Sequence, residues 1–209
     1  MEYLQIGMDL AEYSMNSSLS CIKSSNILAN SLLFPGSLVK SSYQTTYNSE
    51  NYESHLLYIP YGKQYIPAIL VLADENMGSL FCIHLHGNGC DVGQIVKCAI
   101  REAQSFNSHY LIVEYPRFGI MNGFVSEAAV DDITTAVYNY VTEYLKVPTS
   151  RIVLIGRSIG TGPACALASK LEIQGKRPAA VILQSPFCSL KDAAFDLVGT
   201  ISLALLERW

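Results

Sequence analysis

A serine stands between two glycines where an apolar run ends, and this stretch constrains the fold more than any other part of the chain. Residues 151–155 are largely branched and apolar, and the sequence GRSIG follows at 156–160. A small-residue segment with helical character comes next, so Ser158 lies at a strand-to-helix turn. Such a turn strains the backbone at the serine, and side chains two residues away would collide. The pattern predicts a nucleophile elbow with Ser158 as nucleophile and Gly156 and Gly160 as its glycines.

Strand and helix patterns alternate along the rest of the chain. Strands are predicted at 55–59, 65–72, 79–84, 110–114, 151–155 and 179–183, with a hairpin turn at Gly62-Lys63 between the first two. Helices are predicted over 92–103, 159–171 and 192–208, and from Ser126 onward, where Val130, Ile133, Val137, Val141 and Tyr144 recur at helical spacing. This alternation is typical of an α/β fold, a mostly parallel sheet with helices on both faces.

Composition divides the chain into two parts and excludes several classes of partner. Residues 1–36 form a polar arm rich in Ser and Asn, in which we expect a loosely packed helix, and residues 37–209 carry the domain. The net charge is −4 with scattered Lys and Arg, which argues against nucleic-acid binding. Neither a signal peptide nor a membrane span is expected. The six cysteines lack metal-type spacing, so we expect a cytoplasmic protein without metal or cofactor.

A second glycine-rich segment lies upstream, in the sequence HLHGNGCDVG at 84–93. It follows a predicted strand and precedes a predicted helix, which is where a hydrolase of this fold places one oxyanion-hole N–H group. Asn88 or Gly89 would supply that group, and Ile159 the other. A phosphate-binding loop is the alternative, but neither Walker nor dinucleotide spacing is present.

Two other side chains of this segment are assigned structural roles. Asp91, with Gln94 three residues later, has the form of a capping box at the start of a helix. We expect His86 to brace the loop by hydrogen bonding, because it lies on the wrong strand to serve as a triad base.

Five segments of the chain resemble serine hydrolases of the alpha/beta hydrolase domain-containing protein 17 type. They are HGNGCDVG, YPRFG, SEAAVDDITTAVYNYV, VPTSRIVLIGRSIGTGPACALAS and LQSPF. The resemblance runs from about residue 55 to 195. It implies the α/β-hydrolase fold, with Ser158 as nucleophile and Asn88 with Ile159 as oxyanion hole. It also implies that Gly87, Gly89 and Tyr115 belong to the loops around the substrate pocket, with residues 115–119 lining its mouth.

The catalytic base has no candidate in the position that the fold requires. In this fold the triad follows the order serine, acid, histidine along the chain. The four histidines, His55, His84, His86 and His109, all precede Ser158. We read the four carboxylates after Ser158 as surface charges or members of local ion pairs; they are Glu172, Asp192, Asp196 and Glu207. We therefore expect a partial α/β-hydrolase domain that ends after about the sixth strand and has weak or no activity alone.

Two functions are consistent with these features. The first is a serine hydrolase that forms an acyl-enzyme on Ser158 from an ester or thioester, including an acylated protein, since relatives of the resembled type include depalmitoylases. The second is a non-catalytic binding or scaffold protein on the same fold. Peripheral membrane contact is an alternative to a purely cytoplasmic location, although the arm has one cysteine, Cys21, in place of the cluster those depalmitoylases use for attachment. The sequence makes no prediction of oligomeric state.

Overall fold

A six-stranded sheet forms the centre of the computed structural model, which describes residues 34, 55–73 and 80–189. Its strand order is β1-β2-β4-β3-β5-β6. Strands β1 (His55–Tyr61) and β2 (Gln64–Val71) pair in antiparallel register. The two-residue turn between them places Gly62 at φ +57°, a conformation that suits glycine. The predicted hairpin is confirmed.

Four strands of the sheet run parallel to one another. They are β3 (Phe81–Leu85), β4 (His109–Val113), β5 (Ile152–Arg157) and β6 (Ala180–Gln184). Strand β3 pairs with β4 and β5, and β5 pairs with β6, whereas β2 joins β4 in antiparallel register. Leu85 lies opposite both Val113 and Gly156. The carboxyl ends of the three central strands therefore coincide, and the residues that follow them meet at one edge of the sheet.

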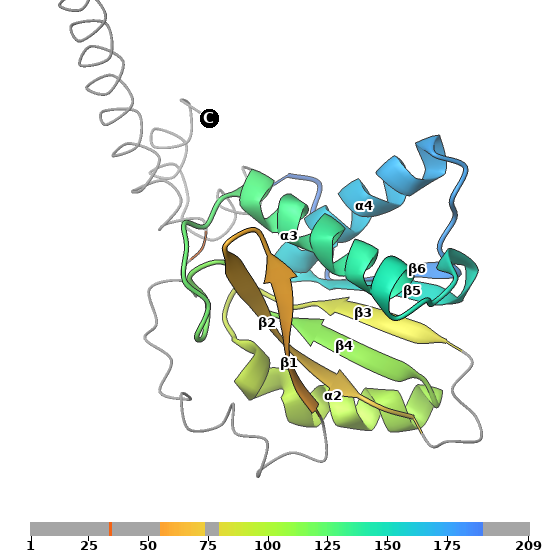
Figure 1. The fold of residues 1–209 in the computed structure, drawn as a ribbon, viewed down its shortest axis with the longest axis horizontal. Helices are drawn as coiled ribbons and strands as arrows, with labels where there is room; N and C mark the ends of the chain where they lie inside the picture. The colour runs from red at the N-terminus through yellow and green to blue at the C-terminus, as the bar shows by residue number, and fades with distance from the viewer. Residues whose placement is uncertain (1–33, 35–54, 74–79, 190–209) are drawn as a thin grey trace, which may run out of the picture.

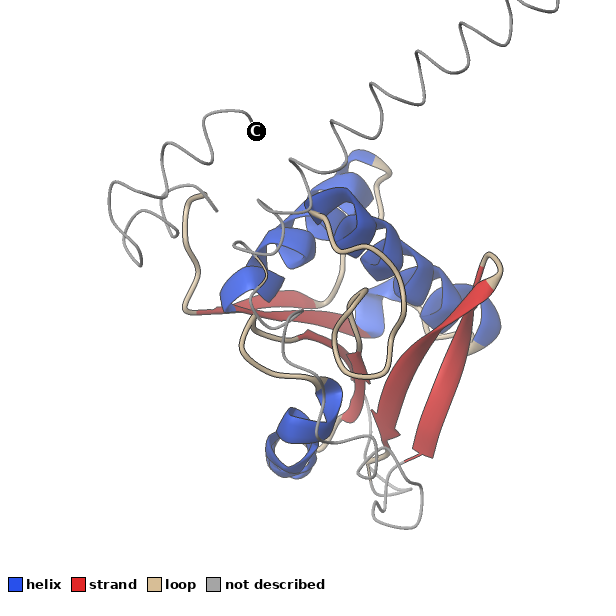
Figure 2. Cartoon of the chain, turned by 90° about the vertical axis from the view of Figure 1, so that its left-hand side faces the viewer, coloured by secondary structure: helices blue, strands red, loops and turns tan. Residues whose placement is uncertain are grey.

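Helices cover both faces of this sheet (Figure 1). Helix α2 (Val92–Phe106) lies on one face, and helices α3 (Glu127–Asn139) and α4 (Thr161–Ile173) lie together on the other, an arrangement also visible in the turned view of Figure 2. Each face has its own core of buried apolar side chains. Burial of these branched side chains on both faces explains the continuous apolar runs of the parallel strands. The predicted α/β fold with helices on both faces is confirmed.

The helix starts follow the predicted capping patterns. The side chain of Asp91 accepts a hydrogen bond from the Gln94 N–H, and the Gln94 side chain accepts from the Asp91 N–H, so both halves of the capping box are formed. The Ser126 hydroxyl accepts from the Ala129 N–H at the start of α3.

Two details differ from the sequence-based expectation. Tyr144 is 73% exposed, although its spacing predicted a core position, because α3 continues as a π-helix over Tyr140–Tyr144 and the wider turn changes the helical phase. The helix predicted at 159–171 begins two residues later, after a 3₁₀ turn at Ser158–Gly160. The strand predicted at 179–183 is present as β6, which lies at the edge of the described sheet and is partly exposed.

Several predictions lie outside the described residues. They include the helix at 192–208 and the N-terminal arm at 1–36, apart from Phe34. Phe34 is buried in the core on the α3 and α4 face. Among the residues that the structure describes, no helix combines the length and the apolar character needed to cross a bilayer.

Candidate functional site

Ser158 occupies a sharp turn between β5 and α4. Its φ is +50°, which places a non-glycine residue in the left-handed region. A 3₁₀ turn spans Ser158–Gly160, and α4 begins directly after it. The Thr161 hydroxyl donates to the Ser158 carbonyl oxygen at 2.6 Å, which ties the turn to the first residue of α4. Backbone strain of this kind persists only where the surroundings hold the residue in place, and it is concentrated at functional sites.

Two glycines flank Ser158 where no Cβ fits. A Cβ on Gly160 would lie 2.1 Å from the Leu85 carbonyl oxygen, and a Cβ on Gly156 would lie 2.5 Å from the Gly160 carbonyl oxygen. In both cases the obstacle is backbone of the central sheet or of the turn itself, which cannot rotate away as a side chain could. The elbow is therefore fixed by close packing of backbone on backbone.

The glycine-rich loop after β3 lies beside this turn. A Cβ on Gly87 would be 3.7 Å from the Cβ of Ser158 and 3.7 Å from the Arg157 carbonyl oxygen. The structure thus brings the loop between β3 and α2 next to Ser158, although 71 residues separate Gly87 from Ser158 in the sequence. Gly89 has open space around its Cβ position, so no steric contact requires a glycine there.

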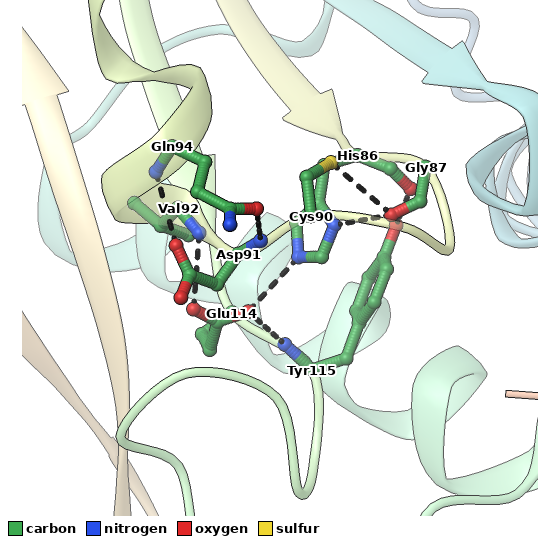
Figure 3. A network of polar contacts seen from close by, with 8 residues as sticks. All are labelled: His86, Gly87, Cys90, Asp91, Val92, Gln94, Glu114 and Tyr115. Carbon is green, nitrogen blue, oxygen red and sulfur yellow. Dashed lines mark hydrogen bonds and ion pairs between the residues drawn. The ribbon is translucent and has the colours of Figure 1, made fainter. Parts of the chain in front are cut away.

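The buried carboxylate of Glu114 anchors the loop between β3 and α2 by hydrogen bonds (Figure 3). The Glu114 Oε1 atom accepts from His86 Nε2 at 3.0 Å and from the Tyr115 N–H at 3.3 Å. Its Oε2 atom accepts from the Val92 N–H at 3.1 Å, in the first turn of α2. His86 and Glu114 are both fully buried. One carboxylate therefore joins the end of β3, the end of β4 and the start of α2.

The surroundings of His86 favour the doubly protonated ring. Its Nε2 atom faces the Glu114 carboxylate, and its Nδ1 atom lies 2.9 Å from the Gly87 carbonyl oxygen, so acceptors stand on both sides. Burial lowers the pKa of His86, but the hydrogen bonds to Cys90 and Glu114 and the charge of Glu114 outweigh it and raise the pKa to about 10. At neutral pH these surroundings favour the imidazolium form of His86. The expected bracing role of His86 is confirmed.

Tyr115 takes a different place from the one predicted. We expected it to line the mouth of the pocket, but it is 1% exposed. Its ring stacks on His86 at a centroid distance of 4.2 Å, and its hydroxyl donates to the His86 carbonyl oxygen at 2.9 Å. Phe118 packs edge-on against both rings. Because the hydroxyl finds an acceptor inside the protein, the ring turns inward and supports the loop.

His84 and His109 contact groups other than Ser158. His84 contacts the Tyr110 ring and lies 3.7 Å from Glu102, on the α2 side of the sheet. Burial, followed by the nearby charges of His86 and Arg157, lowers the pKa of His84 to about 4. The His109 Nδ1 atom accepts from the Ala73 N–H at 3.2 Å.

A cavity of about 140 Å³ lies next to Ile159, the residue after the serine. It lies between the N-terminal halves of α3 and α4 and the segment after β6. Its apolar lining includes Phe34, Val130, Pro163, Ala166 and Phe187. Glu127 and Asp131 add acidic side chains. Burial, with the charges of Glu127 and Asp132, raises the pKa of Asp131 against the opposing effect of Lys170. The cavity is mostly apolar and carries acidic groups at α3.

Sequence reasoning missed Glu114. The one available signal was its position as the last residue of the strand predicted at 110–114. A carboxylate directly after a buried strand stands at the edge of the sheet where sites form. Its partner His86 is 28 residues away, and only the pairing of β3 with β4 brings the two side chains together.

Comparisons with known proteins agree with this geometry. The chain is 32% identical over 110 residues to alpha/beta hydrolase domain-containing protein aho-3 of Caenorhabditis elegans. The matched region covers 53% of this chain and 32% of that protein. The chain is 37% identical over 111 residues to alpha/beta hydrolase domain-containing protein 17C of Xenopus tropicalis, covering 53% of this chain and 34% of that protein. The match thus spans about a third of the length of these curated relatives. No protein-family model matches.

A solved structure shows the same fold over most of the chain. The crystal structure of an alpha-beta hydrolase from Vibrio vulnificus superposes with a TM-score of 0.71 at 19% identity, covering 87% of this chain and 68% of that one. The chain therefore has the α/β-hydrolase fold, and it resembles the alpha/beta hydrolase domain-containing protein 17 proteins over about half of its length.

Proposed function

We propose that this chain, with its α/β-hydrolase fold and its likeness to the alpha/beta hydrolase domain-containing protein 17 proteins, is part of a serine hydrolase that forms an acyl-enzyme on Ser158. The observation that carries the proposal is the elbow. Ser158 has a left-handed backbone between two glycines that admit no Cβ, and the glycine-rich loop at Gly87 lies against it. A strained serine held at a helix start beside such a loop has the geometry of a nucleophile.

The proposed reaction proceeds through two acyl transfers. The Ser158 oxygen attacks the carbonyl carbon of an ester or thioester, a base takes the serine proton, and the carbonyl oxygen becomes an oxyanion. The N–H groups of Asn88 and Ile159 stabilise this oxyanion, and the start of α4 adds its dipole. Collapse of the intermediate expels the alcohol or thiol with that proton, and water then hydrolyses the acyl-enzyme.

The base of this reaction comes from outside the described residues. His86 has acceptors at both ring nitrogens, His84 lies on the α2 side of the sheet, and His109 accepts from a backbone N–H group. In serine proteases with an incomplete triad, the oxyanion hole and substrate binding alone retain about 10³–10⁴-fold catalysis over water. We therefore expect slow but measurable reaction at Ser158 in the chain of 209 residues.

The cavity beside Ile159 is the proposed site for the acyl group. An engineered apolar cavity of about 150 Å³ binds benzene, so a cavity of about 140 Å³ holds a group of similar size. A long chain such as palmitoyl would extend beyond it. We propose esters or thioesters as substrates, with an acylated protein in the cytoplasm or at a membrane surface as the biological form.

Labelling with a fluorophosphonate probe tests this function. The probe phosphonylates an activated serine and needs no identified substrate. Mass spectrometry of the digested protein is expected to place the adduct on Ser158, with no adduct in Ser158→Ala. Addition of free imidazole is expected to accelerate labelling of the wild type, because it supplies a base that the described histidines His84, His86 and His109 do not provide. No adduct at Ser158 in a folded wild-type chain, with or without imidazole, would contradict the proposal.

A non-catalytic binding protein on the same fold is the second candidate. It is favoured by the engagement of His84, His86 and His109 away from Ser158. This function predicts that a short-chain acyl ligand protects the chain against thermal unfolding while Ser158 resists the probe even with imidazole. Labelling that depends on Ser158 would exclude it.

A further inference from the structure

The Gly87 carbonyl oxygen is fixed by two donors. The His86 Nδ1 atom lies 2.9 Å from it, and the Cys90 thiol donates to it over 3.4 Å. Figure 3 shows the imidazole and the sulfur both directed at this one oxygen. The carbonyl therefore points into the network around Glu114.

The direction of this carbonyl also determines the direction of the next N–H group. The peptide bond between Gly87 and Asn88 is trans, and in a planar trans peptide the C=O and the following N–H point in opposite directions. The Asn88 N–H therefore points away from the His86 side of the peptide. Ser158 lies close to the same glycine, since a Cβ on Gly87 would be 3.7 Å from the Ser158 Cβ.

We propose that the buried His86–Glu114 pair aims the Asn88 N–H at the oxyanion by holding the Gly87–Asn88 peptide in one orientation. His86 and Glu114 are thus positioning residues. The inference rests on the proposed function, because it concerns the oxyanion hole of that reaction. It goes beyond that function by assigning the orientation of the hole to two side chains that do not touch the substrate.

The protons of His86 explain why a carboxylate belongs at its other nitrogen. A hydrogen bond from Nδ1 to a carbonyl requires a proton on Nδ1, and the bond to Glu114 requires one on Nε2. Without the Nδ1 proton, the Nδ1 lone pair would repel the Gly87 carbonyl oxygen. Rotation of the Gly87–Asn88 peptide would then relieve this repulsion. Glu114 compensates the charge of a ring that carries both protons, and it also accepts from the Val92 N–H, which fixes the far end of the loop.

Two substitutions of His86 separate its two hydrogen bonds. In His86→Asn the amide nitrogen takes the place of Nδ1, so the donor to Gly87 is kept and the contact with Glu114 is lost. In His86→Gln the amide nitrogen reaches the place of Nε2, so the donor to Glu114 is kept and the one to Gly87 is lost. Both variants remove the charge and the ring, which makes each the control for the other.

Crystal structures and labelling kinetics of the two variants test the inference. In His86→Gln we expect the Gly87–Asn88 peptide to turn and the maximal rate of fluorophosphonate labelling to fall about 10²-fold, the effect of losing one oxyanion donor, with little change in the half-saturating probe concentration. In His86→Asn we expect the wild-type orientation and a maximal rate at least tenfold above that of His86→Gln. Removing the weaker donor in Cys90→Ala should cost less than His86→Gln.

The outcomes separate this inference from the proposed function. If wild-type Ser158 takes no label, the function fails, and the crystal structures alone decide whether His86 sets the peptide orientation. If Ser158 is labelled but folded His86→Gln keeps both the orientation and the wild-type rate, the inference is wrong and the function stands. Equal rates in the two variants would also overturn it, because a purely structural role of His86 predicts no difference between them.

Discussion

The elbow and the loop that faces it are held in place by different forces. At the elbow, Gly156 and Gly160 let backbone approach backbone so closely that a single methyl group would not fit. In the loop, hydrogen bonds connect His86 to Glu114 and to Gly87, and a Cβ at Gly87 or Gly89 would meet no atom closer than 3.7 Å. The elbow requires that Gly156 and Gly160 carry no Cβ atom, whereas the loop requires the ring protons of His86 that form its hydrogen bonds.

This difference predicts how each region responds to change. Steric packing has no dependence on pH, and the insertion of one carbon is enough to disrupt it. A buried ion pair depends on both partners, so the loss of either leaves an uncompensated polar group in the interior. The three predictions that follow test this contrast, beginning with the largest effect.

The elbow should respond most strongly to an added methyl group. Gly160→Ala places a Cβ against the Leu85 carbonyl oxygen, and we expect the free energy of unfolding to fall by at least about 3 kcal/mol. Gly162→Ala, two residues further along α4, is the matched control because no atom lies within 4 Å of its Cβ position. It should raise stability by up to about 1 kcal/mol. Urea unfolding measures both, and a loss below 1 kcal/mol in Gly160→Ala would contradict the steric account.

The loop should respond to the loss of one charge without any change in volume. Glu114→Gln leaves one amide oxygen to serve three donors, those of His86, Val92 and Tyr115, and we expect a loss of about 3 kcal/mol. Glu143→Gln makes the same chemical change at an exposed position and should stay within about 0.5 kcal/mol of the wild type. Similar stability in the two variants would show that the network contributes little.

The stability of the loop should also depend on pH, with a sign set by His86. Its pKa is raised from 6.5 to about 10 in the folded protein, so the folded state binds the proton more tightly. The resulting stabilisation is complete below pH 6.5 and is lost as the pH rises toward 10, by at most about 1.4 kcal/mol per pH unit. Glu114, Cys90, Tyr115 and His84 are the titratable groups around the ring.

Urea unfolding at a series of pH values checks this dependence. The wild-type free energy of unfolding should decline between neutral pH and pH 10 more steeply than that of His86→Asn. Gly162→Ala keeps the network and should decline in parallel with the wild type. A common slope for all three proteins would refute the assignment of a charged ring at His86.

The two regions also differ in how far sequence can predict them. The elbow glycines follow a local rule, since strand, serine and helix are adjacent in the chain, and the same holds for the capping box at Asp91. Glu114 required the pairing of β3 with β4, which sequence patterns do not specify. Tyr115 was placed at a pocket mouth by the family resemblance alone, whereas its hydroxyl donates to the nearby His86 carbonyl oxygen inside the protein.

The overall fold could be predicted from the long periodic patterns of apolar residues, but local departures from regular helix geometry could not. The hairpin, the four parallel strands and the helices on both faces follow from periodicity and turn residues. Tyr144 was misplaced because the change from α-helix to π-helix at Tyr140 shifts the phase, and no residue at this position signals such a shift.

Mass spectrometry of the chain after incubation with an activated acetyl ester tests the central claim most directly. Because His84, His86 and His109 are engaged by other groups in the described part of the chain, water lacks a base there and the acyl-enzyme should persist once formed. We predict one added acetyl group on the peptide that contains Ser158, absent from Ser158→Ala and formed faster with imidazole. A folded wild-type chain that carries no acetyl group on Ser158 under either condition would contradict the account.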